Sequence, residues 1–420
     1  MWCEIMERER NYGLDLLRMV SMLMVAVLHV LGQGGVMART GSNMATYYTC
    51  YFLEAACLCA VNCYGMLSGY VGVRSSFRAK KLISMILTVE FYSIVIGLVL
   101  GLSNRAWLDR DTLLQILLPI QWKTWWYYSA YIGLYFLMPF LNRGVAALSG
   151  HEKRNLMSVS FMIFCVFPLV AKTFSSDFFA LVGGYSLIWL IILYVFGACL
   201  RLLDEENAAG QTHDPARDQG SVQTQGTMPE GGAVQEAGQE IMQEQTPVQP
   251  AQSVQKHDGG QEKGGFWTGV LRLPVPVLLL IFLLSTLLAW FWKYLVDTGV
   301  ITAPADTVFP RMFLFYHSPT IFANGLAMLL IFRQIRIRPG RLRQIIMLFA
   351  PSAFYVYIIH THPLIWEHIL KAALAGWRSM PAAVVLLPVL ALAIGIYLGC
   401  SCVDIGRRQV PRLLSALRKR

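Results

Sequence analysis

Residues 14–36 read LDLLRMVSMLMVAVLHVLGQGGV, an apolar stretch long enough to cross a lipid bilayer as one helix. Asp15, Arg18 and His29 interrupt it. Arg18 and His29 are eleven residues apart, so they lie on nearly one face of a helix and roughly 16 Å apart along its axis. Asp15 precedes Arg18 by three residues, within reach of an ion pair. Because an ionisable side chain inside a span costs about 2.5–3.5 kcal/mol, we expect the chemistry here.

The composition is that of a polytopic membrane protein. Of 420 residues, 55% are hydrophobic and 14% are charged, and the mean hydropathy is +0.49, which excludes an ordinary soluble enzyme. The net charge of +10 does not indicate a nucleic-acid partner, because the basic residues fall in short loops between apolar stretches. The nine cysteines form no CxxC pair and no Cys/His ligand spacing, so we expect no metal site and no tightly bound cofactor.

Ten apolar stretches predict an all-α, polytopic membrane bundle of about ten transmembrane helices. They cover residues 14–36, 45–70, 82–102, 125–141, 155–171, 180–203, 273–295, 312–332, 346–370 and 382–403. With the N-terminus inside, 26 Lys and Arg residues face the cytoplasm and 9 face outward. We therefore expect a plasma-membrane protein with both termini in the cytoplasm. Residues 1–13 mix acids and bases, and no small-x-small site follows, so we expect no removed signal peptide.

One internal segment differs from the rest of the chain. Residues 204–265 are rich in Gln, Gly and Glu and contain no aromatic residue, so they cannot bury enough surface to offset the entropy of ordering. We predict a disordered cytoplasmic loop over 204–271. It divides the membrane domain into residues 1–203, with six spans, and residues 272–420, with four spans and a basic C-terminal tail.

The pattern Arg18-x10-His29, preceded by GLDLLR, resembles the signature of the acyltransferase 3 family of integral membrane acyltransferases. Five later stretches are similar to family spans in the same order: NCYGMLSGYVG (62–72), WYYSAYIGLYFLMPFLN (126–142), YSLIWLIILYVFGACLR (185–201), YHSPTIFANGLAML (316–329) and FYVYIIHTHPLI (354–365). The nearest subgroup is the surface-glycan O-acetyltransferases. One stretch departs from the pattern: many members carry a basic RxxR-P run after the second span, whereas this chain has RSSFRAKKL at 74–82.

The resemblance implies an integral membrane O-acyltransferase. It implies transfer of an acyl group, which we expect to be acetyl, from acyl-CoA to a hydroxyl of a cell-surface or lipid-linked glycan. The partners that it implies are membrane lipid, acyl-CoA as donor substrate, and a glycan or lipid-linked saccharide as acceptor. It also implies that Arg18 and His29 are essential.

The candidate catalytic residues are His29, Arg18 and Asp15. An imidazole suits removal of a hydroxyl proton at neutral pH, and His29 could instead take the acyl group itself. A guanidinium suits a donor phosphate or a thioester carbonyl, with Asp15 holding it in place. The purely structural alternatives are a histidine packed between helices, a cytoplasmic anchor, and an acid favoured by the helix dipole.

The candidate donor-binding residues share a positive charge and a predicted inner location. Their cations suit the phosphates of coenzyme A, and they suit lipid headgroups equally well. They are Arg18, Arg74, Arg78, Lys80 and Lys81.

The candidate acceptor-side residues are Glu54, His360 and Trp126. Glu54 is an acid within a span. His360 is preferred to His362, because a two-residue offset on a helix points the two rings about 200° apart. Trp126 belongs to an aromatic stripe at 122–128, which suits either an interfacial belt or a platform for stacking sugars.

Two other functions compete with this interpretation. A transporter or flippase for lipid-linked saccharides also uses buried charges in a wide bundle, but the two halves show no matching broken helices. An inactive relative retained for an interaction is disfavoured by the intact Arg18 and His29.

Overall fold

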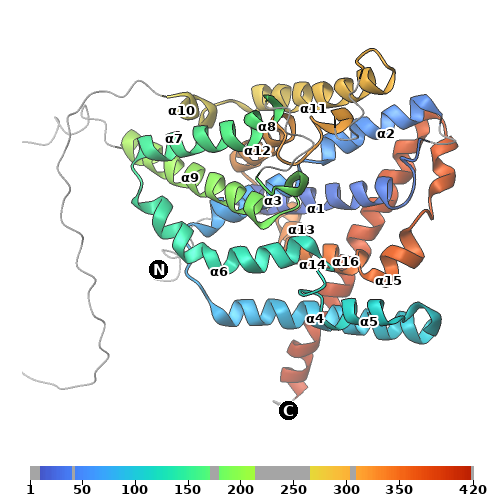
Figure 1. Ribbon diagram of the computed structural model, residues 1–420. Helices are drawn as coiled ribbons and strands as arrows, with labels where there is room; N and C mark the ends of the chain where they lie inside the picture. The colour runs from blue at the N-terminus through green and yellow to red at the C-terminus, as the bar shows by residue number, and fades with distance from the viewer. Residues whose placement is uncertain (1–9, 40–42, 171–178, 213–264, 303–308, 418–420) are drawn as a thin grey trace, which may run out of the picture.

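The computed structural model describes residues 10–39, 43–170, 179–212, 265–302 and 309–417, and the regular structure in these ranges is helical (Figure 1). This confirms the predicted all-α fold. The helices are α1 (Tyr12–Gly32), α2 (Met44–Cys57), α3 (Ala60–Gly72), α4 (Ala79–Ser103), α5 (Arg110–Leu117), α6 (Trp126–Ala147), α7 (Gly150–Phe161), α8 (Phe167–Val170), α9 (Leu187–Thr212), α10 (Phe266–Leu271), α11 (Val275–Asp297), α12 (Pro319–Gln334), α13 (Arg341–Phe349), α14 (Ala353–His360), α15 (Pro363–Ile365) and α16 (Ala382–Leu417).

Seven helical stretches in the described residues are long and apolar enough to cross a membrane. They are Tyr12–Gly32, Met44–Gly72, Ala79–Ser103, Leu187–Ala208, Val275–Asp297, Arg341–His360 and Ala382–Val410. The other three predicted spans coincide with α6, with the run from α7 to α8, and with α12, which has only 16 residues. The polytopic helical bundle is confirmed.

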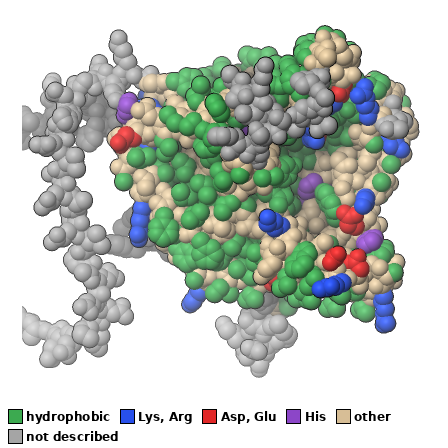
Figure 2. Space-filling view, viewed as in Figure 1, with side chains coloured by type: hydrophobic (Ala, Val, Ile, Leu, Met, Phe, Trp, Pro, Cys, Tyr) green, Lys and Arg blue, Asp and Glu red, His purple; other side chains and the backbone are tan. Residues whose placement is uncertain are grey.

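Much of the outer surface is apolar. Hydrophobic side chains cover a large part of the face in Figure 2, and few charged side chains interrupt them. On α4, Leu87 and Leu102 expose 63% and 74% of their surface, and Leu284 of α11 exposes 55%. A surface of this kind is stable against lipid tails and not against water.

Helix α1 lies inside the bundle, against α3, α12, α14 and α16 (Figure 1). Asn11 begins it by accepting a hydrogen bond from the amide of Gly13. Its residues Leu17, Ala26 and Val30 are completely buried. Because protein surrounds α1, its ionisable side chains meet other side chains and not lipid.

Helices α3 and α9 pack through glycines. A Cβ atom added at Gly69 would lie 1.8 Å from the carbonyl oxygen of Tyr194, and one added at Gly197 would lie 1.9 Å from that of Met66. Lipid tails are as apolar as leucine, so membrane helices gain stability by close approach, and small residues permit it. This contact joins the second predicted span to the sixth.

Two predicted spans are broken helices. The span at 45–70 consists of α2 and α3, with a turn at Leu58 and Cys59. The span at 346–370 consists of α13, α14 and α15, followed by a π-helical turn over Trp366–Leu370. Pro363 has no amide hydrogen, so it favours a new start over continuation of α14. Irregular backbone at membrane depth is tolerated where it is buried in protein or lines a cavity.

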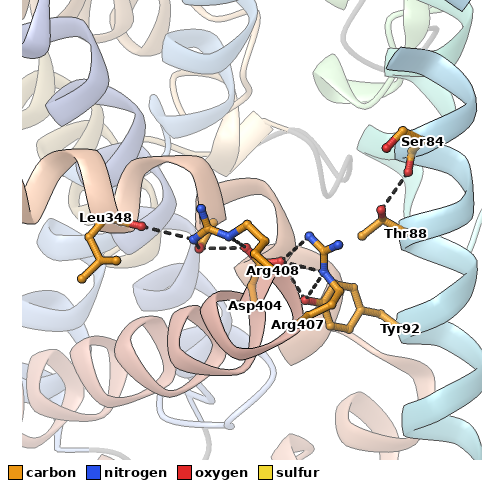
Figure 3. A network of polar contacts seen from close by, with 8 residues as sticks. Ser84, Thr88, Tyr92, Leu348, Asp404, Arg407 and Arg408 are labelled. Atoms are coloured by element: carbon orange, nitrogen blue, oxygen red, sulfur yellow. Dashed lines mark hydrogen bonds and ion pairs between the residues drawn. The ribbon is translucent and has the colours of Figure 1, made fainter. Parts of the chain in front are cut away.

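Helix α16 crosses α1 and is held by a buried carboxylate, Asp404 (Figure 3). Asp404 accepts hydrogen bonds from Tyr92 of α4 at 2.7 Å and from Ser352 at 2.8 Å. Arg407 and Arg408 pair with it at 2.8 and 3.0 Å. Two arginines therefore balance the charge of the buried carboxylate, and its hydrogen bonds join α16 to α4 and to the turn after α13.

The ends of the predicted loop at 204–271 are helical. Helix α9 continues through residues 204–212, and α10 occupies Phe266–Leu271. Asp204 pairs with Arg333 of α12 and accepts a hydrogen bond from Tyr70 at 2.6 Å, which explains why the chain stays ordered beyond residue 203. The remainder of the predicted loop, 213–264, lies outside the described residues.

The glycine contact between α3 and α9 yields a first prediction. Gly69→Val should lower the thermal unfolding midpoint of the detergent-extracted protein and its monodisperse yield, because the added atoms meet backbone and overpacking costs about 1–3 kcal/mol or more. Gly395→Val on α16 is the matched control, since no atom beyond the local backbone of its own helix lies within 4 Å of the added Cβ. Equal midpoints for the two variants would contradict this account of the packing.

Candidate active site

Asp15 and Arg18 form an ion pair near the start of α1. The Nη1 atom of Arg18 lies 2.7 Å from Oδ1 of Asp15, as the three-residue spacing predicts. The other carboxylate oxygen accepts from Nε of Arg10 at 2.6 Å. The hydroxyl of Tyr64 donates to the backbone carbonyl of Arg18 at 2.9 Å. Asp15 therefore fixes the Arg18 side chain, and Tyr64 anchors the helix at the same level.

His29 lies farther along the same face of α1 and lines a cavity of about 500 Å³. Met22 and Val25, which follow Arg18 at helical spacing, line this cavity too. Arg18 itself is not among the lining residues. At 1.5 Å per residue its Cα lies roughly 16 Å from that of His29 along the axis. We call this cavity the chamber. His29 lines it, whereas Arg18 lies nearer the start of α1 and outside the lining.

Three side chains from the broken ninth span surround the His29 ring. Nδ1 of His29 lies 2.8 Å from Nε2 of His360, the last residue of α14. Trp366 meets His29 edge to face, with ring centroids 4.9 Å apart. Tyr357 lies at 6.4 Å. Helix α14 ends at His360 and α15 begins at Pro363. Because of this break, His360 and Trp366, only six residues apart, both contact His29 of α1.

Aromatic rings form a wall of the cavity. Trp126 of α6, Tyr185 and Tyr316 contact one another, with centroids 4.8 Å apart for Trp126 and Tyr185 and 4.7 Å apart for the two tyrosines. All three line the cavity, as do Tyr64 and Tyr127, which meet in a T-shaped pair at 6.1 Å. Rings of this kind offer flat apolar faces with polar edges, which suits a sugar ring.

Charged and amide groups complete the lining. Glu54 of α2 lies 3.7 Å from Arg311, and both line the cavity. Glu367 and Gln33 are further polar members of the lining. Gln33 donates to the carbonyl of Trp366 at 3.1 Å, which ties the end of α1 to the stretch after α15. The chamber therefore combines flat apolar faces with a few fixed hydrogen-bonding groups, as ligand sites do.

The basic residues at 74–81 lie elsewhere, on the surface. Arg74 pairs with Glu205 at 2.7 Å, and Arg78, Lys80 and Lys81 are exposed. None of these residues lines the cavity. They follow the end of α3, at the same end of the bundle as the start of α1. Several contacts show this: Tyr70 donates to Asp204, Asp204 pairs with Arg333, and Asn11 donates to the carbonyl of Arg333 at 3.0 Å.

The Acyltransferase domain family matches residues 11–400, nearly the whole chain. The chain belongs to this family. It is an acyltransferase, and the chamber beside His29 is its candidate active site. Neither the curated proteins nor the solved structures compared with this chain include a match.

The predicted site residues of this acyltransferase fall into three groups, according to their distance from the chamber. His29, Glu54 and Trp126 line the chamber. His360 lies behind His29 and does not line it. Arg18 and Asp15 lie nearer the start of α1 and are not part of the lining, and the basic residues at 74–81 lie on the surface at that end of the bundle. His362 points away, with Nε2 3.0 Å from the carbonyl oxygen of Ser93, so the two neighbouring histidines do face different ways.

Other residues of the acyltransferase chamber were not predicted. Gln33 follows His29 by four residues, a helical spacing that the sequence shows. The others come from segments far from α1 in the chain, where no helical period links them to His29. Pro363 is the sequence signal that could have predicted the helix break before Trp366. The residues that were not predicted are Gln33, Tyr185, Arg311, Tyr316, Trp366 and Glu367.

Asp15 allows a second prediction. Asp15→Asn removes the charge that holds Arg18, and a hydrogen bond between charged groups contributes about 1.5–3 kcal/mol, so acyl transfer should fall roughly 10- to 100-fold. The measurement is the transfer rate of purified protein with its unfolding midpoint. Glu152→Gln, the same chemical change at an exposed position, should leave the rate unchanged. A normal transfer rate in Asp15→Asn would show that Arg18 does not need Asp15 for its function.

Proposed function

We propose that this acyltransferase moves an acetyl group from acetyl-CoA to a hydroxyl of a cell-surface or lipid-linked glycan. The observation that carries the proposal is the position of His29 in the wall of a 500 Å³ chamber that also holds an aromatic platform and fixed polar groups. A chamber of this size accommodates a small ligand. The choice of acetyl and of a glycan is supported by the resemblance of the chain to the surface-glycan O-acetyltransferases.

His29 serves as the general base in this proposal. The acceptor hydroxyl oxygen attacks the thioester carbonyl carbon, and its proton passes to a ring nitrogen of His29. The carbon–oxygen bond of the ester forms as the carbon–sulfur bond breaks. The departing sulfur takes the proton from His29, so coenzyme A leaves as the thiol and the imidazole is neutral again. In this route His29 carries only the proton, and no acyl-enzyme forms.

The donor approaches from the end of the bundle where α1 begins. Arg18 would bind a phosphate or the polar end of the donor, held in place by Asp15. The exposed cations at 74–81 lie at that same end and suit the phosphates of coenzyme A. The acceptor then enters from the other end, where Trp126 and Tyr316 offer stacking faces and Glu54 offers a hydrogen-bond acceptor.

A third prediction tests the function directly. Surface and lipid-linked glycans from cells with the wild-type chain should carry acetyl groups in mass spectra, and those from cells with His29→Ala should not. Purified His29→Ala should transfer acetyl from acetyl-CoA about 10²–10⁴-fold more slowly, the usual loss for a general base. His29→Gln should be nearly as slow, because an amide cannot take the proton.

The control for His29 is His151→Gln, an exposed histidine of α7 that contacts Asn155. It should transfer acetyl at the wild-type rate. Near-normal transfer by His29→Ala would overturn the catalytic assignment. Glycans that are identical with and without the wild-type chain would overturn the acceptor class.

We further propose a plasma-membrane location with both termini in the cytoplasm. The excess of inner basic residues supports it, 26 against 9. The end of the bundle where α1 begins then faces the cytoplasm, where acetyl-CoA is made, and the aromatic wall faces outward.

A fourth prediction tests this orientation. Reporter fusions after Gly340 and at Arg420 should report the cytoplasm, and a fusion near Asp109 should report the outside. Gly340 lies between α12 and α13, and Asp109 precedes α5. Arg420 lies outside the described residues and is used only as an attachment point. One reproducible reversal among the three would require a different topology.

A further inference from the structure

His360 is a buried histidine whose two ring nitrogens both have partners. Only 4% of its surface is exposed, and it does not line the chamber. Its Nε2 lies 2.8 Å from Nδ1 of His29. Its Nδ1 lies 2.5 Å from the backbone carbonyl oxygen of Val356, one turn earlier in α14. The ring is therefore held at both ends and bridges α14 to α1.

These two contacts determine which nitrogen of each ring carries hydrogen. A backbone carbonyl oxygen only accepts, so Nδ1 of His360 must donate to Val356. In a neutral ring the other nitrogen then accepts, so Nδ1 of His29 donates to Nε2 of His360. Nε2 of His29 is left with a free lone pair, and it has no hydrogen-bond partner within the described part of the chain.

The opposite direction of this hydrogen bond is costly. If His29 accepted at Nδ1, His360 would have to carry hydrogen on both nitrogens and a positive charge. Its described polar contacts are His29 and the carbonyl of Val356, and neither is an anion. Burying an unpaired charge is far more costly than burying a neutral ring. The neutral arrangement is therefore the resting one.

We propose that His360 is a positioning residue, which fixes His29 in the tautomer whose Nε2 is the base. This rests on the proposed function. When Nε2 of His29 takes the acceptor's proton, the His29 ring becomes positive, and its Nδ1–H bond to His360 becomes charge-assisted and stronger. The proton then returns from Nε2 to the departing sulfur, and His360 is chemically unchanged. His360 thus acts through His29 and does not belong to the acceptor side.

The rest of the pocket supports this role. Trp366 lies edge-on against the His29 ring, so the ring is confined from a second direction. His362 provides the contrast, because its Nε2 faces the carbonyl of Ser93 on α4 and its Nδ1 accepts from the amide of Leu364. It is equally buried and two residues away, yet it makes no described contact with His29. His362 is therefore the matched control for His360.

The fifth prediction compares two substitutions at His360. His360→Gln supplies a carbonyl oxygen that can accept from His29, whereas His360→Phe keeps a ring of similar size without an acceptor. We expect kcat for acetyl-CoA turnover to fall about 10²–10⁴-fold in His360→Phe, since a wrong tautomer disables the base. His360→Gln should stay within about tenfold of wild type, because its amide oxygen can accept the same neutral hydrogen bond. KM for acetyl-CoA should not change in either variant.

The assay uses the purified full chain in lipid nanodiscs, with acetyl-CoA as donor, water as acceptor, and thiol release as the readout. A packing role for His360 predicts the reverse order, because Phe fills the space better than Gln. Equal or higher kcat in His360→Phe than in His360→Gln would therefore overturn the inference. If His360→Phe is not recovered folded, His360→Met replaces it, since it also lacks an acceptor nitrogen.

Two further arms separate the possible failures. In a His29→Ala background, His360→Phe should cause no further loss, because the two residues act as one unit, and an additive loss would contradict the inference. His362→Gln should keep the wild-type kcat, and a loss equal to that of His360→Phe would indicate a structural effect. If the wild-type protein neither hydrolyses acetyl-CoA nor transfers acetyl to membrane glycans, the proposed function itself fails.

Discussion

The constraint on which the structure depends is that ionisable groups on a central membrane helix need partners from protein. Lipid supplies none, so the bundle must provide them. Asp15 meets two arginines, and His29 meets His360. Farther along the chain, Asp404 is matched by Arg407 and Arg408 in the same way. Asp15 finds its partners on or next to its own helix, whereas the contact of His29 with His360 joins α14 to α1.

Broken helices supply what straight helices cannot. Side chains of one straight helix repeat along its axis, so a single helix cannot surround a histidine with several groups. The breaks around α14 and α15 turn the chain twice within a few residues, and this places His360 beside one edge of His29 and Trp366 beside another. The break between α2 and α3 likewise separates Glu54, which faces the chamber, from the glycine contact with α9.

In the proposed function, the arrangement along α1 keeps the donor and the acceptor at different ends of the bundle. Arginine and the other cations lie toward one end of the bundle, and aromatic faces with Glu54 and Arg311 lie toward the other. The histidine lies between them. The axial rise of a helix is fixed by backbone hydrogen bonds, so the distance between Arg18 and His29 along α1 does not depend on loops. In the proposed function, the acyl group is transferred beside His29, between these two regions.

The sequence by itself determined the all-helical membrane bundle, the shared face of Arg18 and His29, and the ion pair of Asp15 with Arg18. All three follow from local helix geometry, which depends only on spacing along the chain. Only the tertiary structure decided which residue stands behind His29, because His360 lies 331 positions away and reaches it through a helix break. It also decided that the basic loop at 74–81 lies on the surface and that α9 continues past residue 203, where Asp204 finds a partner in Arg333. Contacts between distant segments depend on how helices pack, which no periodicity within one segment specifies.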